Sequence, residues 1–260
     1  MKLKENVNKR VVIVGATSGI GLSLAKLYLQ KGYIVGAAGR NLCSLDSLKE
    51  KYPDKLFTEI IDVTQDNAEE NLISLINKTG GMDLYIHSSG VSQRKATAKD
   101  KLSPDLCVVN TNCMGFTRMI DKAFEYFEDK GEGQIAVLTS MAGTKGTGLS
   151  AVYSSSKKFQ STYLEALNQL VKIKKLKIRI TDIQPGIVDT PILNGKKYPF
   201  MMHPDKAARL TIKHIEGKRK RKVIDNRYAV VAFFWRMIPF SIWVNLPIKY
   251  KTPRGEELVK

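Results

Sequence analysis

The sequence predicts one α/β domain, a doubly wound parallel sheet with helices on both faces. Short β-branched runs alternate with amphipathic stretches along most of the chain, the pattern of repeated strand–helix units. The length of 260 residues suits a single domain, and an apolar fraction of 43% is enough for its core. A glycine-rich turn follows the first apolar run directly. Because ligands of such sheets bind beyond the carboxyl ends of the strands, we expect functional residues there.

The predicted elements follow one another in regular order. The strand-like runs lie at residues 11–14, 33–38, 56–61, 84–87, 134–139 and 178–184. Helix-like stretches lie at residues 19–31, 42–52, 66–78, 103–129 and 151–174. A further helix is expected at 204–218, with Pro204 in its first turn. Right-handed crossovers would connect the parallel strands.

Neither the N-terminus nor the cysteines indicate an exported protein or a metal site. The run at 11–14 follows two basic residues, but glycine and hydroxyl residues soon interrupt it, so we expect a buried strand rather than a signal peptide. The three cysteines have neither metal-ligand spacing nor a pairing scheme: Cys43, Cys107 and Cys113. They indicate buried thiols in a reducing cytosol, and we expect a cytoplasmic protein without a metal.

The turn GATSGIG, from Gly15 to Gly21, predicts a nucleotide site. Glycines allow positive φ and a close backbone approach, and the N-terminus of the following helix offers N–H groups to phosphate. The spacing is G-x-x-x-G-x-G rather than G-x-G-x-x-G, and a plain structural turn is the alternative. The cofactor contacts predicted here are Gly15, Thr17, Ser18, Gly19, Ile20 and Gly21.

The end of the second strand indicates which nucleotide binds. An acidic residue about twenty positions after the glycine turn would hold a ribose 2′-hydroxyl, whereas an arginine accommodates a 2′-phosphate. Gly39 occupies the acidic position and is followed by Arg40 and Asn41, which predicts NADP(H) in preference to NAD(H). A solvated surface charge is the alternative for Arg40. Asp62 and Val63 follow the third strand, where the carboxylate would accept from the adenine amino group or else cap a helix.

Tyr153 and Lys157 form the predicted catalytic pair. Residues at i and i+4 share one face of a helix, so the ammonium would lie beside the phenol and lower its pKa toward neutrality. Such a phenol can exchange a proton with a substrate oxygen. Ser140 lies thirteen residues before Tyr153. Together with a nucleotide site, this group predicts hydride transfer to or from a carbonyl.

In combination these motifs make residues 10–190 resemble the short-chain dehydrogenases/reductases of the classical type. The motifs are GATSGIG, Ser140, Tyr153-x-x-x-Lys157 and Pro185-Gly186-Ile187-Val188-Asp189-Thr190. The resemblance implies a Rossmann-type three-layer fold and NAD(P)-dependent oxidation or reduction. It also implies that Ser140 polarises the carbonyl, Tyr153 is the general acid/base, and Lys157 lowers the tyrosine pKa and holds the nicotinamide ribose.

The resemblance implies further site residues. Asn112, with Asn110 as the alternative, would hold a water that relays protons through Lys157. The family's turn beside the nicotinamide corresponds to Pro185 and Gly186. Val188 is a further expected cofactor contact, and Thr190 would contact the carboxamide or the phosphates. The usual Asn-Asn-Ala-Gly after the fourth strand is replaced by His87-Ser88-Ser89-Gly90. Ser89 and Gly90 are expected at the cofactor, and His87 is expected to brace the sheet.

The resemblance implies that the segment at about 190–218 covers the substrate, and it would complete a catalytic domain at 1–228. Its apolar residues are Ile192, Leu193, Tyr198, Phe200, Met201 and Met202. Side chains of these types suit an adaptable apolar pocket, although ordinary packing would explain about half of them. The predicted substrate is a hydrophobic ketone or secondary alcohol, such as a lipid-derived, steroid-like or 3-oxoacyl compound.

The C-terminal third is strongly basic, and residues 229–260 form a predicted extension. Residues 172–260 carry 21 Lys and Arg against 7 Asp and Glu, which accounts for 14 of the 17 net positive charges. The apolar stretch at 229–248 is interrupted by Arg236 and two prolines, so it is too broken to span a bilayer. We expect residues 218–254 to contact an anionic membrane peripherally, at its inner face, with Trp235 and Trp243 at headgroup depth. Packing on the body or a second subunit, or an acidic protein partner, are the alternatives.

Two functions follow from these observations. The first is an NADP(H)-dependent oxidoreductase, and the second is a non-catalytic dinucleotide-binding sensor or membrane-attached interaction protein. The intact Ser140–Tyr153–Lys157 set favours the enzyme. Nucleic acid is not favoured as a partner because an apolar block interrupts the basic residues. The resemblance implies a homo-oligomer, a dimer or tetramer, paired through the helices at 103–129 and 151–174.

Overall fold

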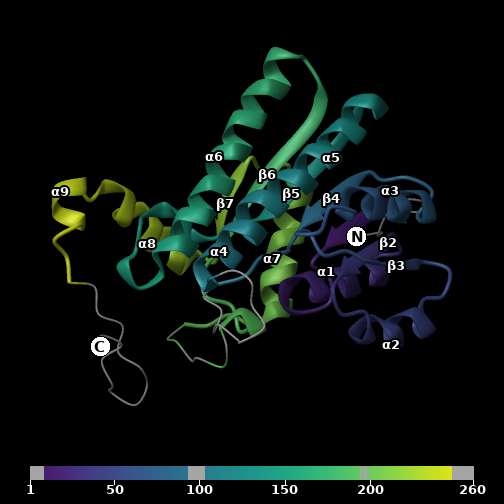
Figure 1. Ribbon diagram of the computed structural model, residues 1–260, viewed down its shortest axis with the longest axis horizontal. Coiled ribbons are helices and arrows are strands. Elements are labelled where there is room, and N and C mark those ends of the chain that lie inside the picture. The colour runs from purple at the N-terminus through teal and green to yellow at the C-terminus, as the bar shows by residue number, and fades with distance from the viewer. Residues whose placement is uncertain (1–8, 93–102, 194, 196–197, 199, 248–260) are drawn as a thin grey trace, which may run out of the picture.

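A seven-stranded parallel sheet forms the centre of the protein (Figure 1). The computed structural model describes residues 9–92, 103–193, 195, 198 and 200–247. The strands are β1 (Arg10–Val14), β2 (Ile34–Gly39), β3 (Leu56–Ile60), β4 (Leu84–His87), β5 (Glu132–Leu138), β6 (Lys177–Pro185) and β7 (Arg221–Ile224). Their order is β3-β2-β1-β4-β5-β6-β7. The predicted doubly wound α/β fold is confirmed, with each of the six predicted strands within two residues of its expected ends.

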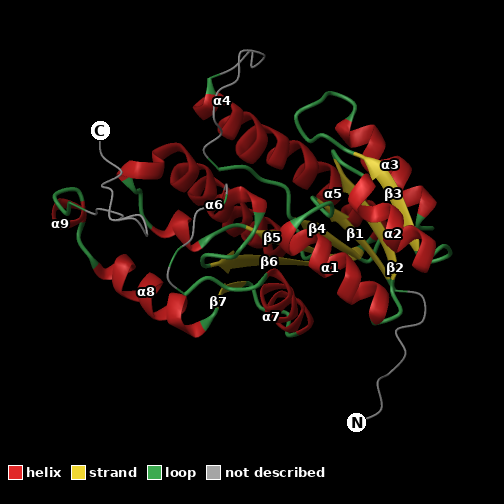
Figure 2. Ribbon diagram, turned by 90° about the horizontal axis from the view of Figure 1, so that it is seen from below, coloured by secondary structure: helices red, strands yellow, loops and turns green. Residues whose placement is uncertain are grey.

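Helices cover both faces of this sheet (Figure 2). They are α1 (Gly19–Gln30), α2 (Cys43–Lys51), α3 (Ala68–Lys78), α4 (Pro104–Val109), α5 (Phe116–Lys130), α6 (Ala151–Ile173), α7 (Pro204–Glu216), α8 (Asn226–Met237) and α9 (Phe240–Trp243). One apolar core lies between the sheet and α1, α2 and α7, around Leu24, Leu45 and Ile212. A second lies between the sheet and α3, α5 and α6, around Phe116 and Leu164.

The strand order reverses at β1, which pairs with β2 on one side and β4 on the other. Segments leaving neighbouring strands therefore meet beyond the carboxyl end of β1. Gly15, at φ +91°, is so close to the segment after β4 that a Cβ would lie 2.5 Å from the backbone nitrogen of Ser89. Only glycine fits both this conformation and this contact. The sheet thus brings two predicted cofactor segments together.

The helix predicted at 103–129 is continuous but not uniform. A π-helical turn at Asn110–Gly115 separates α4 from α5. At its end, a Cβ on Gly115 would lie 2.7 Å from Cγ2 of Val63, so glycine allows the turn to approach the segment after β3. Single π-helical turns occur frequently at functional sites, and this one contains Asn112.

Part of the basic run at residues 218–222, expected at a membrane surface, lies in the sheet instead. Arg221 and Lys222 begin β7, whose Arg221 is in register with Asp182 of β6, so the run does not form one free cationic cluster. The next helix, α8, then crosses the predicted boundary at 228/229 without a break. α8 and α9 lie at the opposite end of the molecule from β3 (Figures 1 and 2). Within the described residues, no helix has the length and apolar character needed to cross a membrane; positions 248–254 of the predicted membrane segment lie outside this part of the chain.

Candidate active site

A cavity of about 980 Å³ lies beyond the carboxyl ends of the central strands. It brings together most of the residues predicted for cofactor binding and catalysis. These are Gly15, Thr17, Ser18, Gly19, Ile20, Arg40, Asp62, Val63, Ser89, Gly90, Ser140, Tyr153, Lys157, Pro185, Gly186, Val188 and Thr190. Three predicted residues are not part of its lining: Gly21, Asn41 and Asn112.

Ser140, Tyr153 and Lys157 meet in this cavity. Ser140 directly follows β5, and the other two lie on successive turns of α6. The Ser140 hydroxyl is hydrogen-bonded to Tyr153, and Nζ of Lys157 lies 5.9 Å from the centroid of the tyrosine ring. Gly143 allows this approach, because a Cβ there would lie 2.8 Å from the backbone carbonyl carbon of Lys157.

The pKa expected for Tyr153 was wrong in direction. Burial raises the pKa of Tyr153 above its ordinary value, and the hydrogen bond to Ser140 opposes that rise only in part. Burial also lowers the pKa of Lys157 to about 8, although the charges of Asp182 and then Cys113 raise it. The ammonium donates to the Leu138 carbonyl at 3.3 Å and to Oε1 of Gln160 at 2.9 Å. Desolvation of the phenolate therefore outweighs the attraction that the i, i+4 spacing predicted.

Asn112 lies behind the cavity wall and is fully buried. Its Oδ1 accepts from the backbone nitrogen of Val91 at 2.9 Å, and its Nδ2 donates to the Val91 carbonyl at 2.8 Å and to Oγ of Ser156 at 3.0 Å. The side chain thus joins the loop after β4 to α6. The main-chain carbonyl of Asn112 accepts from Nε2 of Gln160 at 2.9 Å, a contact that the sequence motifs did not indicate.

His87 is buried and neutral. Burial, with a smaller contribution from Lys157, lowers its pKa to about 3. Its Nδ1 lies 3.1 Å from the Tyr85 hydroxyl, and its ring packs edge-on against Phe116 with the centroids 5.5 Å apart. These contacts fit the bracing role expected for His87.

The glycine turn fits a bound pyrophosphate. Ser18, the residue before α1, is extended and makes no side-chain hydrogen bond to the helix, so its side chain does not cover the first N–H groups of α1. Gly19 has φ +52°, and a Cβ there would lie 3.0 Å from Cγ2 of Thr190. Gly21 has a packing role instead, because a Cβ there would lie 2.0 Å from the Gly15 carbonyl oxygen. The residues present therefore suit a dinucleotide.

Residues after β2 and β3 contribute to the lining of this cavity. Arg40 is exposed and lines it, whereas Oδ1 of Asn41 accepts from the backbone nitrogen of Cys43 at 3.1 Å. A Cβ on Gly39 would lie 2.7 Å from Cγ2 of Thr17, which leaves no room for an acidic side chain there. Oδ1 of Asp62 accepts from the nitrogen of Thr64 at 3.0 Å and stabilises that turn while lining the cavity.

Helix α8 forms part of the cavity wall, which sequence reasoning missed. Tyr228, Val231 and Trp235 line the cavity from this helix. Tyr228 packs so closely on the Pro-Gly turn that a Cβ on Gly186 would lie 2.0 Å from its ring carbon Cδ2. The three residues are three and four positions apart, a helical spacing that was visible in the sequence.

The predicted substrate-covering segment is divided between the cavity and the core. Ile192 and Leu193 line the cavity, whereas Met202 is buried in the core and Phe200 is 67% exposed. α7 packs against α1 and is joined to it by a hydrogen bond of 2.6 Å from Ser23 to Asp205.

Hydrogen bonds also join the α8–α9 segment to the loop that precedes α6. Nε1 of Trp243 donates to the Gly146 carbonyl at 2.6 Å, and Nζ of Lys145 donates to the Ile238 carbonyl at 2.7 Å. Trp235 and Trp243 pack together with their ring centroids 5.3 Å apart. Trp243 is buried, so the expectation that it lies at lipid headgroup depth is wrong. Its ring packs on Trp235, and its N–H is hydrogen-bonded to Gly146.

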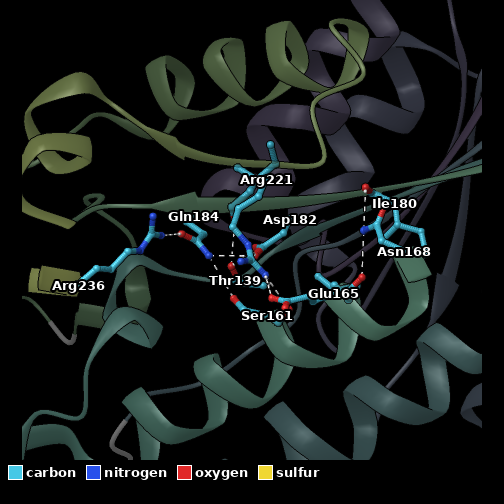
Figure 3. A network of polar contacts seen from close by, with 11 residues as sticks. Thr139, Ser161, Glu165, Asn168, Ile180, Asp182, Gln184, Arg221 and Arg236 are labelled. Carbon is cyan, nitrogen blue, oxygen red and sulfur yellow. Dashed lines mark hydrogen bonds and ion pairs between the residues drawn. The ribbon is translucent and has the colours of Figure 1, made fainter. Parts of the chain in front are cut away.

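A polar network surrounds the buried carboxylate of Asp182 (Figure 3). The Asp182 carboxylate accepts from Oγ1 of Thr139 at 2.5 Å, from Nε2 of Gln184 at 2.9 Å and from Nε of Arg221 at 2.9 Å. Oε1 of Gln184 in turn accepts from Nη2 of Arg236 at 3.2 Å. The network therefore joins α8 to β6, the strand next to the edge strand β7.

Known proteins resemble this chain in sequence and in fold. A relative from Myxococcus xanthus, described as an uncharacterized oxidoreductase, is 29% identical over 213 residues, which cover 80% of this chain and 83% of the relative. A short chain dehydrogenase from Burkholderia cenocepacia J2315, solved in complex with NADP, superposes with a TM-score of 0.77 at 17% identity over 95% of this chain and all of that one. A 3-ketoacyl-(acyl-carrier-protein) reductase from Brucella melitensis, solved with NADH, gives a TM-score of 0.73 at 19% identity over 85% of this chain and 98% of the other.

The sequence profile of the short chain dehydrogenases matches residues 9–198, the part of the chain that contains the glycine turn, Ser140, Tyr153 and Lys157. This match covers well over half of the chain, from β1 to the loop before α7. The protein therefore belongs to the short-chain dehydrogenase/reductase family of oxidoreductases.

Proposed function

We propose that the protein is an NADP(H)-dependent oxidoreductase of hydrophobic ketones or secondary alcohols, with Tyr153 as the general acid/base. The observation that carries this proposal is the meeting of Ser140, Tyr153 and Lys157 in the same cavity as the glycine turn. NADP(H), when bound, supplies or accepts the hydride. The residues of the chain bind the substrate oxygen and transfer the proton.

The hydrogen bonds and pKa directions support these roles. The hydroxyls of Ser140 and Tyr153 would donate to the substrate oxygen and stabilise the charge that develops on it during reduction. A raised pKa keeps Tyr153 protonated, the form that gives a proton to this oxygen. In the reverse direction Tyr153 takes the proton from the alcohol, and the Lys157 ammonium stabilises the phenolate.

Replacing Tyr153 by phenylalanine tests the role of its hydroxyl. We expect turnover to fall by about 10²–10⁴-fold, the usual contribution of general acid–base catalysis, while NADPH binding changes little. The measurements are NADPH consumption with a panel of ketones and NADPH binding by fluorescence. Tyr163→Phe is the matched control, since Tyr163 lies on the same helix but bonds Asp121 outside the cavity. Wild-type turnover in Tyr153→Phe would contradict the assignment, and NADPH binding without consumption of any ketone would favour a binding-only protein.

The preference for NADP(H) depends on Arg40. Arg40 lines the cavity just after β2, where an arginine would accommodate a 2′-phosphate, and Gly39 leaves no acidic group to bind a ribose hydroxyl. Arg40→Asp should raise the KM for NADPH by about tenfold or more and change the KM for NADH much less. Lys51→Asp, at the exposed end of α2, controls for the change in net charge. Unchanged discrimination between the two nucleotides would remove this assignment.

The apolar part of the cavity lining supports a hydrophobic substrate. It includes Ile187, Ile192, Leu193, Val231 and Trp235. An apolar lining with a few polar groups suits a lipid-derived, steroid-like or 3-oxoacyl compound whose carbonyl reaches Ser140 and Tyr153.

We also propose that α8 and α9 contact an anionic membrane from the cytoplasmic side. The outer face of these helices exposes Val230, Phe233, Phe234, Met237 and Phe240, and residues 226–247 contain no Asp or Glu. An apolar face free of carboxylates suits an anionic lipid surface better than another copy of this basic chain. Phe233→Ser/Phe234→Ser should lose sedimentation with anionic liposomes, whereas Phe159→Ser on α6 should retain it. Equal sedimentation of both variants would contradict the membrane contact.

A homo-oligomer paired through α4, α5 and α6 is the expected assembly. The faces of α4, the π-helical turn and α6 expose Leu106, Val109, Met114 and Phe159. Met114→Glu would place a charge in such an interface and should shift the sedimentation coefficient toward that of a monomer. An unchanged sedimentation coefficient would exclude this face as the interface.

A further inference from the structure

Gln160 has both ends of its amide engaged beside the catalytic lysine. It is fully buried on α6, one turn after Lys157. Its Oε1 accepts from Nζ of Lys157 at 2.9 Å, and its Nε2 donates to the main-chain carbonyl of Asn112 at 2.9 Å. The orientation of the amide is dictated by its partners, because an ammonium can only donate and a carbonyl can only accept.

The π-helical turn presents the carbonyl that Gln160 binds. Asn112 lies within this turn, where the regular pairing of an α-helix is interrupted, and its carbonyl is directed to α6. The side chain of Asn112 binds Oγ of Ser156, which donates to the Tyr153 carbonyl at 2.8 Å. Gln160 therefore completes a buried set of contacts that connects Lys157 to the backbone of Tyr153.

The amide oxygen of Gln160 is the nearest acceptor of the Lys157 ammonium. The Leu138 carbonyl lies farther away, at 3.3 Å, and Asp182 acts on Lys157 through its charge. A buried ammonium is costly unless its donors are satisfied, so this oxygen both stabilises the charge and restricts the position of Nζ. An amide has no proton to pass on at neutral pH, so the contact holds the lysine and does not relay protons.

We propose that Gln160 is a positioning residue for the reaction, holding the Lys157 ammonium beside Tyr153 by joining it to the Asn112 carbonyl. This inference rests on the proposed function of Tyr153 and Lys157. It differs from the water-relay role expected for Asn112, since the link between Asn112 and Lys157 runs through a fixed side chain. The sequence contained no signal for it, because the contact depends on how the π-helical turn faces α6.

Two substitutions test this role. Gln160→Met keeps the length of the side chain and removes both hydrogen bonds, and we expect kcat for ketone reduction to fall about tenfold, as for the loss of a hydrogen bond to a charged group. Gln160→Glu places a carboxylate beside the ammonium. A negative charge raises the pKa of both Lys157 and Tyr153, so reduction should persist to higher pH, by about one unit. Gln169→Met, on the exposed side of α6, is the matched control.

The measurements are kcat and KM from about pH 6 to pH 10, with thermal unfolding of each variant. A kcat of Gln160→Met within about twofold of the wild type would overturn the proposal, as would a pH profile of Gln160→Glu that superposes on that of the wild type. If Gln160→Met proves unstable, the profile of Gln160→Glu decides, because it shifts only if the side chain at position 160 contacts the Lys157 ammonium during the reaction. Failure of the proposed function is distinguishable, since it would appear as undiminished turnover by Tyr153→Phe in the same assay.

Discussion

Nε of Arg221, at the start of the edge strand β7, lies 2.9 Å from Oδ2 of Asp182 in β6. The Asp182 side chain is 2% exposed and that of Arg221 is 39% exposed, so a buried carboxylate is neutralised from the rim of the sheet. Nη2 of Arg221 also lies 3.1 Å from Oε2 of Glu165 on α6. The pair thus fixes β7, and with it the start of α8, to the strand that ends at the cavity.

Loss of the Arg221 guanidinium should destabilise the protein. Arg221→Gln leaves Asp182 buried without its cation, and we expect the free energy of unfolding to fall by about 1–3 kcal/mol. Urea denaturation at pH 7 measures this loss. Arg219→Gln, an exposed arginine two residues earlier, should change stability far less. Equal effects of the two substitutions would show that the Asp182 contact contributes little.

The buried ammonium of Lys157 should make stability depend on pH. Its pKa is about 8 in the folded protein and 10.5 ordinarily, so between these values the unfolded chain binds more protons. The free energy of unfolding should therefore rise with pH from about 8 to about 10, by on the order of 3 kcal/mol at most. Urea denaturation of the wild type and Lys157→Met at several pH values tests this. Lys157→Met should lack the rise, and the exposed neighbour Lys158→Met should keep it; identical slopes in all three would refute the low pKa.

A methyl group on Gly186 should disturb the cavity wall. It would overlap the ring of Tyr228, so Gly186→Ala should push α8 away from the Pro-Gly turn and cost about 1–3 kcal/mol of stability. The KM for a bulky ketone should change as well, because Tyr228, Val231 and Trp235 line the cavity. Gly148→Ala is the control, since a Cβ there meets nothing within 4 Å. A Gly186→Ala protein as stable as this control would contradict the close packing.

The hydrogen bond from Trp243 should help to hold α9 on the body. Trp243→Phe keeps an aromatic ring but loses the N–H that donates to the Gly146 carbonyl, and we expect about 1 kcal/mol lower stability. Hydrogen exchange of α8 and α9 should become faster in this variant. Exchange at the wild-type rate would indicate that the apolar contact with Trp235 is sufficient.

The sequence was enough to predict the architecture and most of the cavity because both depend on local patterns. Alternating apolar runs identified six strands, and turn glycines such as Gly15 marked the points of close approach. The seventh strand was missed because only Val223 and Ile224 carry an apolar signal, while Arg221 and Lys222 suggest a solvated surface. Arg221 lies in the sheet because its guanidinium pairs with the carboxylate of Asp182, 39 residues earlier.

Contacts between distant segments account for the other differences. The pKa of Tyr153 depends on how deeply the folded chain buries the phenol. The i, i+4 spacing of Tyr153 and Lys157 gives no information about this burial. The place of Trp243 was misjudged because its partner, the Gly146 carbonyl, belongs to a loop almost a hundred residues earlier. Gln160 was missed for the same reason, since its amide bonds a carbonyl on a different helix.

The wide turn at Asn110–Gly115 fixes the rotational phase of everything that follows it in the helix. A residue inserted into this turn would turn α5 by about 100° relative to α4, the angle per residue of an α-helix. Phe116, Ile120 and Phe127 would then leave the core face of α5 together. The length of this segment is therefore under a stricter constraint than its amino-acid identities, and single-residue insertions there should be tolerated less well than substitutions.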